Sequence, residues 1–306
     1  MTDNSVLLLI IQIIIPLSII LWFVLKRMNS QVGLLLDVIL TVFITGFIII
    51  SGRWDIYSIY FQYVIVFIFI IGLLYRIRLF AELDTLPDND LVSWFLLLGK
   101  LIVIVIFGML NYQIYQGYQF NNDVLNISFP LKNGDYYITE GGNNRILNKY
   151  INRKGEHYAS DIVKLDFWGM GSQKFNPNSL SDYNIYADTV YSPVDGRIVD
   201  VIDTLNNGSP GKKDLNNHLG NYVVIEYLNN LIILSNLKKN SVLVPSDMYV
   251  TTGQPIAQVG NTEKGLEPSL HFFAIRGTDV NNITNGYGLP IMTDNDYLIK
   301  NSVIHR

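Results

Sequence analysis

Four long apolar runs occupy the first part of this 306-residue chain and limit what it can fold into. They cover residues 5–25, 32–51, 58–75 and 94–113. Each is close to the ~20 residues that an α-helix needs to cross a hydrocarbon core about 30 Å thick. The first run lacks a small-residue cleavage site and is followed by Lys26 and Arg27, which favours a retained helix over a cleaved signal peptide. The sequence therefore predicts four transmembrane helices.

Composition changes after residue 117. Residues 1–117 are dominated by Leu, Ile, Val and Phe, whereas residues 118–306 are rich in Asn, Asp, Gly and Tyr. This split predicts a membrane domain at 1–117, a linker and entry strand at 118–139, and a water-soluble domain at 140–306. The chain has no cysteine, which excludes disulfides and cysteine-based zinc sites. Its net charge is −4 and it has no strongly basic stretch, so nothing indicates nucleic-acid binding.

The basic residues of the short loops predict the orientation in the membrane. Lys26 and Arg27 lie in the first loop, Arg53 lies in the second, and Arg76 and Arg78 lie beside the end of the third run. Cytoplasmic loops carry an excess of Lys and Arg. Loops one and three are therefore expected to be cytoplasmic, and the C-terminal domain is expected outside the cytoplasm.

Two ionisable residues lie within the apolar runs. Asp37 is in the second run and Lys100 in the fourth, at similar depth under this topology. A lone charge in a bilayer is unfavourable, and pairing reduces the penalty. An ion or substrate path is one interpretation; a structural pair, or a snorkelling Lys100, is the other. We favour the structural interpretation because one pair does not make a pathway.

The soluble half has the pattern of antiparallel strands and turns. After a short linker that ends at Pro130, apolar runs alternate with clusters of Gly, Asn, Asp and Pro. Strands are expected at residues 189–191, 197–202, 222–227, 231–234 and 255–259. The polar segments 166–188 and 206–219 are expected to be long loops that line a binding groove.

Four sequence blocks stand out in the soluble half: residues 191–199 (YSPVDGRIV), 220–226 (GNYVVIE), 252–261 (TGQPIAQVGN) and 267–272 (EPSLHF). Together they resemble the lysostaphin-type (LytM-like) zinc metallopeptidases of bacterial cell walls. A fifth, residues 157–161 (HYASD), fits the family's H-x-x-x-D motif. The order agrees over roughly residues 140–276. The resemblance implies a mixed chain, with four transmembrane helices followed by a mainly antiparallel β domain containing a duplicated hybrid motif.

The resemblance also implies a zinc site. In this family the ligands are the His and Asp of H-x-x-x-D and the second His of H-x-H, which correspond here to His157, Asp161 and His271. Two imidazoles and one carboxylate suit zinc and leave a position for water. The alternative is a hydrogen-bonded His–Asp pair in an empty groove.

Two catalytic histidines of the family are replaced. The first His of H-x-H is Ser269, and the His of a Y-x-H-L motif corresponds to Asn236, or to Ser235 if the alignment slips by one residue. Neither replacement can take up a proton near neutral pH. Losing a general base lowers a rate roughly 10²–10⁴-fold. Among the chain's four histidines, His218 in the 206–219 loop is the candidate for a substitute base.

Three functions follow from these features. The favoured one is a degenerate, zinc-binding module on the bacterial cell membrane that faces the wall and binds peptidoglycan peptides or a cell-envelope protein. The second is a working zinc endopeptidase that cleaves peptidoglycan. The third gives the main function to the four helices, with the β domain as a sensor or anchor. Whether the protein is an enzyme stays open at this point.

Overall fold

The computed structural model describes residues 3–28, 30–87, 90–120, 123–211, 218–263 and 267–306. It consists of two compact units. The first unit spans Met1–Trp54 and Ile59–Tyr115, and the second comprises Asp55–Ser58 and Gln116–Arg306.

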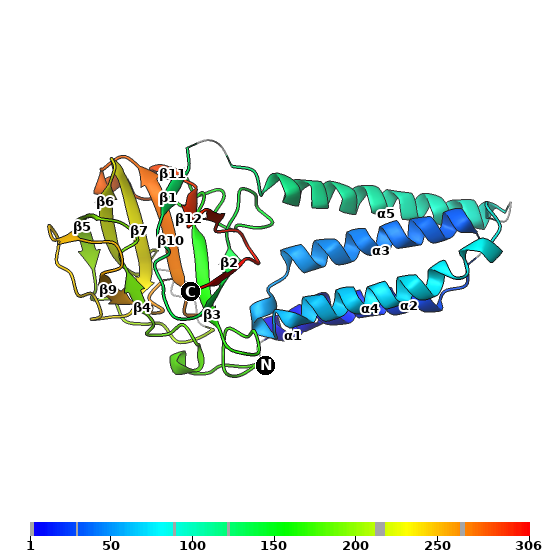
Figure 1. Cartoon of the computed structure of the whole chain (residues 1–306), viewed down its shortest axis with the longest axis horizontal. Coiled ribbons are helices and arrows are strands. Elements are labelled where there is room, and N and C mark those ends of the chain that lie inside the picture. The colour runs from blue at the N-terminus through cyan, green and yellow to red at the C-terminus, as the bar shows by residue number, and fades with distance from the viewer. Residues whose placement is uncertain (1–2, 29, 88–89, 121–122, 212–217, 264–266) are drawn as a thin grey trace. The chain divides into compact units, whose positions relative to one another are not determined.

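The first unit is helical. Its elements are α1 (Asp3–Leu9), a π-helical turn (Ile10–Ile14), α2 (Ile15–Leu25), α3 (Gln31–Ser51), α4 (Tyr60–Ile77) and α5 (Leu91–Gln116), coloured blue to green in Figure 1. Ser30 begins α3, because its hydroxyl accepts a hydrogen bond from the Gly33 amide that the helix itself cannot pair. Within the described residues, four helical stretches are long and apolar enough to cross a membrane: Val6–Leu25, Gln31–Ser51, Tyr60–Glu82 and Leu91–Gln116. They coincide with the four predicted runs.

One carboxylate and two ammonium groups meet inside this unit. Asp37 Oδ1 lies 2.7 Å from Lys100 Nζ, and Asp37 Oδ2 lies 3.0 Å from Lys26 Nζ. Asp37 is buried, while the side chains of Lys26 and Lys100 are 29% and 13% exposed. The sequence pointed to Lys100 as the partner of Asp37. It gave no sign of Lys26, which lies outside the apolar run but reaches back along α2.

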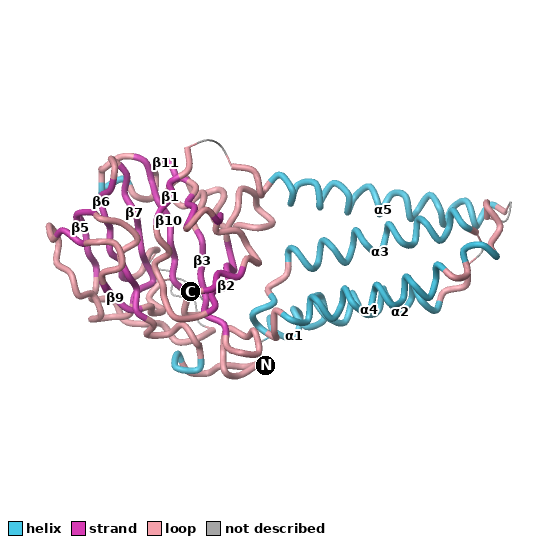
Figure 2. The backbone as a smooth tube through the Cα atoms, in the orientation of Figure 1, coloured by secondary structure: helices cyan, strands magenta, loops and turns pink. Residues whose placement is uncertain are grey.

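The second unit is built on an antiparallel sheet. Among the described residues, nine strands form it in the order β14-β2-β3-β10-β7-β6-β5-β8, with β11 also paired to β10 (Figures 1 and 2). The strands are β2 (Asp135–Glu140), β3 (Ser160–Leu165), β5 (Gly196–Ile202), β6 (Asn221–Tyr227), β7 (Asn230–Leu237), β8 (Tyr249–Val250), β10 (Leu270–Arg276), β11 (Tyr287–Leu289) and β14 (Val303–His305). The predicted class, membrane-type helices followed by a mainly antiparallel β domain, is confirmed.

Two small sheets accompany the main one. The first joins β1 (Leu125–Ile127), β12 (Ile291–Thr293) and β13 (Asp296–Tyr297), and the second joins β4 (Thr189–Tyr191) and β9 (Pro255–Gln258). β1 falls inside the segment predicted as a linker. A strand of three residues is too short to show the alternation that marks a strand in sequence.

Both faces of the main sheet are covered, and alternation along β10 assigns its side chains to them. Leu270, Phe272 and Ala274 join the larger apolar core. Phe273 and Ile275 join a smaller cluster that includes Tyr150. Successive side chains of a strand point to opposite faces, so His271 lies on the face of this smaller cluster.

Candidate metal centre

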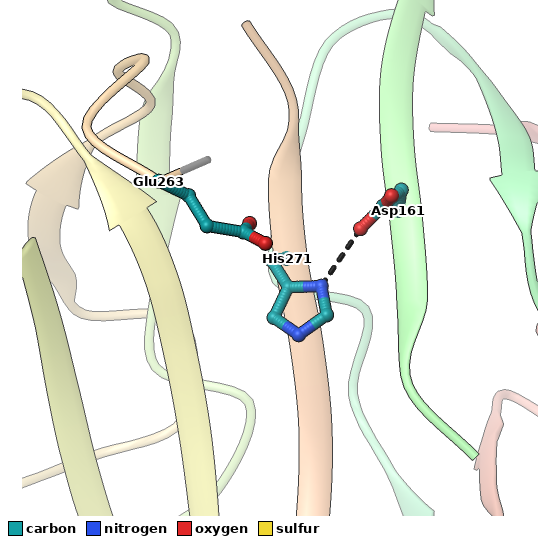
Figure 3. A group of neighbouring side chains, drawn as sticks. All are labelled: Asp161, Glu263 and His271. Carbon is teal, nitrogen blue, oxygen red and sulfur yellow. Dashed lines mark hydrogen bonds and ion pairs between the residues drawn. The ribbon is translucent and has the colours of Figure 1, made fainter. Parts of the chain in front are cut away.

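Asp161 and His271 meet across two adjacent strands. β3 and β10 are antiparallel neighbours, and their register sets His271 directly opposite Asp161. His271 Nδ1 lies 2.7 Å from Asp161 Oδ1, as Figure 3 shows. His271 is fully buried and Asp161 is 5% exposed. The sheet register thus joins residues far apart in sequence into one polar group inside an apolar domain.

Glu263 completes a group of three possible metal ligands. It lies in the segment that precedes β10 and is itself buried. One ligand atom each from Asp161, Glu263 and His271 lie within 4.8 Å of one another. The sequence analysis missed Glu263. The available signal was its position, two residues after the 252–261 block and shortly before His271.

The chemistry of these three residues fits a divalent cation. An imidazole nitrogen and two carboxylate oxygens are ligands that zinc accepts. The imidazole nitrogen that faces Asp161 is His271 Nδ1, whereas the buried Nε2 is directed at Glu156 Oε2, 3.6 Å away. An ion held by His271 and the two carboxylates would be stabilised by charge in a dry environment.

The ammonium group of Lys149 already contacts Asp161, one of the three possible metal ligands. Its Nζ lies 2.7 Å from Asp161 Oδ2, and the hydroxyl of Tyr150 donates to the same carboxylate at 2.9 Å. Burial opposes ionisation of Asp161, but the Lys149 charge and the His271 hydrogen bond together hold its pKa below the usual value. A metal would therefore compete with the Lys149 ammonium for one oxygen of Asp161.

In the absence of metal, the neighbouring carboxylates determine whether the His271 imidazole is protonated. Burial alone lowers the pKa of an imidazole, but the Glu263 charge and the hydrogen bond to Asp161 outweigh it and raise the pKa of His271 to about 10. Glu263 responds differently, since burial raises its pKa. Carboxylates with opposite shifts in one site are typical of functional centres.

Glu156 links this group to His218. Glu156 is 1% exposed; its Oε1 lies 2.6 Å from His218 Nε2, and its Oε2 lies 3.6 Å from His271 Nε2. Arg153 Nη1 contacts the same carboxylate at 2.6 Å. Burial opposes ionisation of Glu156, but its bonds to the two histidines lower its pKa. His218, predicted as a residue near the groove, therefore borders the site through Glu156.

His157 lies outside the group of three. It is partly buried, its Nε2 is 3.4 Å from Asn143 Oδ1, and its ring packs edge-on against Tyr158. The turn before β3 is the physical reason, because β3 begins only at Ser160 and the alternation of a strand does not extend back to residue 157. Glu156, one residue earlier, faces His271 instead. The structure brings Asp161 and His271 together, and a ligand role for His157 stays a prediction.

Asn236 and Ser269, the predicted replacements of catalytic histidines, are bonded to each other. Asn236 Nδ2 donates to the Ser269 carbonyl oxygen at 2.8 Å, and Asn236 Oδ1 accepts from the amides of Thr262 and Glu263 at 2.7 and 2.8 Å. Asn236 sits where the β6–β7 register shifts, with a left-handed φ of 64° that Asn tolerates. Its carboxamide therefore holds the backbone that carries Glu263.

Ser235, the position reached if the alignment slips by one residue, is also buried. Its hydroxyl lies 3.3 Å from the backbone carbonyl oxygen of His271. Neither alignment puts an imidazole at this place, and in both the side chain that is present bonds to backbone groups.

Comparison with known proteins agrees with these motifs. Residues 181–282 match the family described as Peptidase family M23. This stretch contains Asn236, Glu263, Ser269 and His271, and it begins after Asp161. The predicted resemblance of the C-terminal domain to lysostaphin-type peptidases is confirmed.

Solved structures with a similar domain are distant in sequence. A zinc-containing peptidase from Vibrio cholerae is 23% identical, with 49% of this chain and 37% of that chain covered and a TM-score of 0.32. Lysostaphin from Staphylococcus simulans is 18% identical, with 49% and 47% covered and a TM-score of 0.30. The SpoIIQ–SpoIIIAH pore-forming complex is 14% identical, with 41% and 63% covered and a TM-score of 0.25. The chain thus spans less than half of the first two structures. No curated protein matches the sequence.

Proposed function

We propose that this protein is a membrane-anchored, metal-binding relative of the lysostaphin-type peptidases that has lost ordinary peptidase activity and recognises peptidoglycan peptides or a cell-envelope protein. Zinc is the metal we propose. The four apolar helices would anchor the chain in a bacterial membrane. The basic residues Lys26, Arg27, Arg76 and Arg78 support an extracytoplasmic position of the β domain.

One observation carries the proposed loss of activity. The NH₂ group of the Asn236 carboxamide donates a hydrogen bond to the Ser269 carbonyl oxygen, and its oxygen accepts hydrogen bonds from two backbone amides. An amide also cannot take up a proton near neutral pH. Neither of the positions where related peptidases carry histidine therefore supplies a general base.

The remaining residues still support metal binding. Asp161, Glu263 and His271 would hold the ion, and Lys149 would give up one oxygen of Asp161. When bound, such an ion supplies Lewis acidity towards water or a peptide carbonyl. Around it, Arg153 holds the Glu156 carboxylate beside the imidazole of His218, and Tyr150 orients Asp161 by its hydroxyl.

A second function, an active endopeptidase, is favoured by His218 alone. Its Nε2 lies 2.6 Å from Oε1 of the buried Glu156, and its side chain is 35% exposed. A carboxylate that orients a solvent-accessible imidazole is the arrangement of a general base. In this alternative His218 would do the work of the replaced histidines.

Full-length protein in detergent distinguishes the two. The protein is loaded with zinc and incubated with purified peptidoglycan, and both co-sedimentation and release of soluble fragments are measured. We expect the wild type to co-sediment with peptidoglycan. It should release no more soluble fragments than the Asp161→Asn variant does. Release that is lost in both Asp161→Asn and His218→Gln would establish the endopeptidase. A protein that neither sediments with peptidoglycan nor releases fragments would leave a protein partner as the proposed ligand, to be sought by cross-linking in cells.

A further inference from the structure

A cavity of about 680 Å³ lies inside the helical unit, between the end of α2, the first half of α3 and the start of α5. Its walls include Trp22, Leu34, Phe95 and Val103, so most of its surface is apolar. Lys26, Arg27 and Lys100 also line it, together with Asp37. A space of this size with apolar walls and a few polar groups is typical of a ligand site.

The charges around this cavity do not balance. Three cations, Lys26, Arg27 and Lys100, face one carboxylate, Asp37, which is shared between the two lysines. The Asp90 carboxylate, which accepts hydrogen bonds from Ser93 at the start of α5, does not line the cavity. Counted over the described residues that line it, positive charge is therefore in excess. In a low-dielectric environment such an excess is unfavourable unless an anion compensates it.

The cations extend from the end of α2 into the apolar space, where Lys26 and Lys100 meet at Asp37. Lys26 and Arg27 follow the last residue of α2, and the Lys26 ammonium is 4.6 Å from the centre of the Trp22 ring. Asp37 is six residues into α3, which is about 9 Å at 1.5 Å per residue. Charge at the membrane boundary with apolar walls beneath it is the complement of an anionic amphiphile.

We propose that this cavity binds an anionic phospholipid, with its phosphate at Lys26, Arg27 and Lys100 and an acyl chain along the apolar walls of α3 and α5. The inference rests on the proposed membrane insertion and is independent of the chemistry of the β domain. A free inorganic anion would use the charges and leave the apolar walls uncovered. A second copy of the chain would cover the walls and leave the charges uncompensated.

The test measures retained lipid on the full-length chain in neutral detergent. Phosphatidylglycerol or phosphatidylcholine is added at equal concentration, and bound lipid is counted by native mass spectrometry; inorganic phosphate serves as a third arm. We expect the wild type to retain phosphatidylglycerol in preference to phosphatidylcholine. Inorganic phosphate should not displace the retained lipid.

Two kinds of variant separate the contribution of the cations to lipid binding from the contribution of the cavity volume. Lys26→Gln with Arg27→Gln should weaken phosphatidylglycerol retention on the order of 10- to 100-fold, as expected for loss of charge-assisted contacts. Arg78→Gln, an exposed basic residue at the end of α4, is the matched control and should retain lipid as the wild type does.

Gly99→Phe keeps every charge and fills the cavity. Gly99 lines the cavity, and a Cβ added there would meet no atom within 4 Å, so the helix should tolerate the substitution. Lipid retention should fall while the ion pairs of Asp37 stay intact. Leu98→Phe, the neighbouring exposed position on α5, is the control.

Each alternative result would overturn the proposal. Equal retention of the two lipids by the wild type would indicate ordinary lipid around the helices. Displacement by inorganic phosphate would indicate an anion site only. Dimers lost in Gly99→Phe without any dependence on lipid would assign the cavity to a second copy. Recovery of the chain in the soluble cell fraction would reject membrane insertion itself, which is a separate failure.

Discussion

The carboxamide Nδ2 of Asn236 lies 2.8 Å from the carbonyl oxygen of Ser269, so the two predicted replacements of catalytic histidines are bonded to each other. Through its oxygen the same carboxamide holds the amides of Thr262 and Glu263. A position expected to be catalytic has become part of the support of the candidate metal centre.

Asn236→Ala is therefore expected to destabilise the protein as well as the site. Buried donors left without partners each cost about 1–3 kcal/mol, and Thr262 N and Glu263 N would both lose theirs, so we expect a loss of roughly 2–4 kcal/mol. Chemical denaturation monitored by circular dichroism measures it. Asn240→Ala is the control, because Asn240 is exposed and has a similar left-handed φ of 57°. Equal losses in the two variants would assign the effect to the backbone conformation.

Metal affinity should identify the third ligand. Asp161→Asn and His271→Gln should each reduce zinc binding by more than about 100-fold, since even residues that only support ligands change affinity 10- to 100-fold. Glu263→Gln should have a similar effect, and His157→Gln should have little. Isothermal titration of the full-length protein after chelation measures these affinities. Strong loss in His157→Gln with none in Glu263→Gln would favour the ligand set expected from sequence.

Lys149→Met should tighten the same site. The ammonium that competes for Asp161 Oδ2 is removed, while the length of the side chain is kept. Weaker zinc binding in Lys149→Met would show that Lys149 supports the bound state rather than the empty one.

Without metal, stability should fall at alkaline pH. The pKa of His271 is raised from 6.5 to about 10 in the folded protein, so the protonated imidazole stabilises the fold fully below about pH 6.5, and this contribution is lost as the pH rises towards 10. The lowered pKa values of Asp161 and Glu156 act in the opposite direction, with stability lost below about pH 4.5. The raised pKa of Glu263 adds to the decline as the pH rises.

Thermal melts in EDTA at pH 5.5 and pH 9 measure this dependence. The midpoint should be higher at pH 5.5, and His271→Gln should flatten the difference. His305→Gln, at an exposed histidine paired with Asp135, should leave it unchanged. A midpoint that is the same at both pH values in the wild type would contradict a protonated His271.

In the helical unit, the more damaging single substitution should be at Asp37. Lys100→Leu leaves Asp37 paired with Lys26, whereas Asp37→Leu leaves two buried or half-buried ammonium groups facing each other. Breaking a buried pair costs roughly 3–5 kcal/mol. Melting of the detergent-solubilised protein should rank Asp37→Leu below Lys100→Leu, with partial recovery in the double variant. The reverse ranking would show that Lys26 does not take part in the pair.

Much of the fold could be predicted, because it depends on long or repeated signals. A run of twenty apolar residues permits few alternatives, and β5, β6 and β7 are segments of seven or eight residues rich in Val, Ile and Leu and bounded by turn residues. β1 and β13, with three and two residues, carry too little pattern. The parallel pairing of β1 with β12 depends on contacts more than 160 residues apart along the chain, as between Leu125 and Ile291.

The candidate site was predicted in part for a related reason. Asp161 and His271 lie in strands whose register fixes their approach. His157, Glu156 and Lys149 lie in turns before β3, where the direction of a side chain depends on local backbone geometry and not on a repeat. Glu263 reaches the site because Asn236 holds its amide, a long-range hydrogen bond that no local pattern encodes.

The position of β10 in the sheet has a consequence for biogenesis. β10 lies between β3 and β7, and Asp161 and His271 are separated by 110 residues. Contacts this distant in sequence form late in folding, because closing the long loop between them costs chain entropy before the contacts can stabilise the fold. During synthesis β5, β6 and β7 can pair as they emerge, whereas β3 has no partner on its β10 side until residue 276 has emerged. The candidate metal centre is assembled in the same step that closes the sheet, because Asp161 and His271 meet only when β10 pairs with β3.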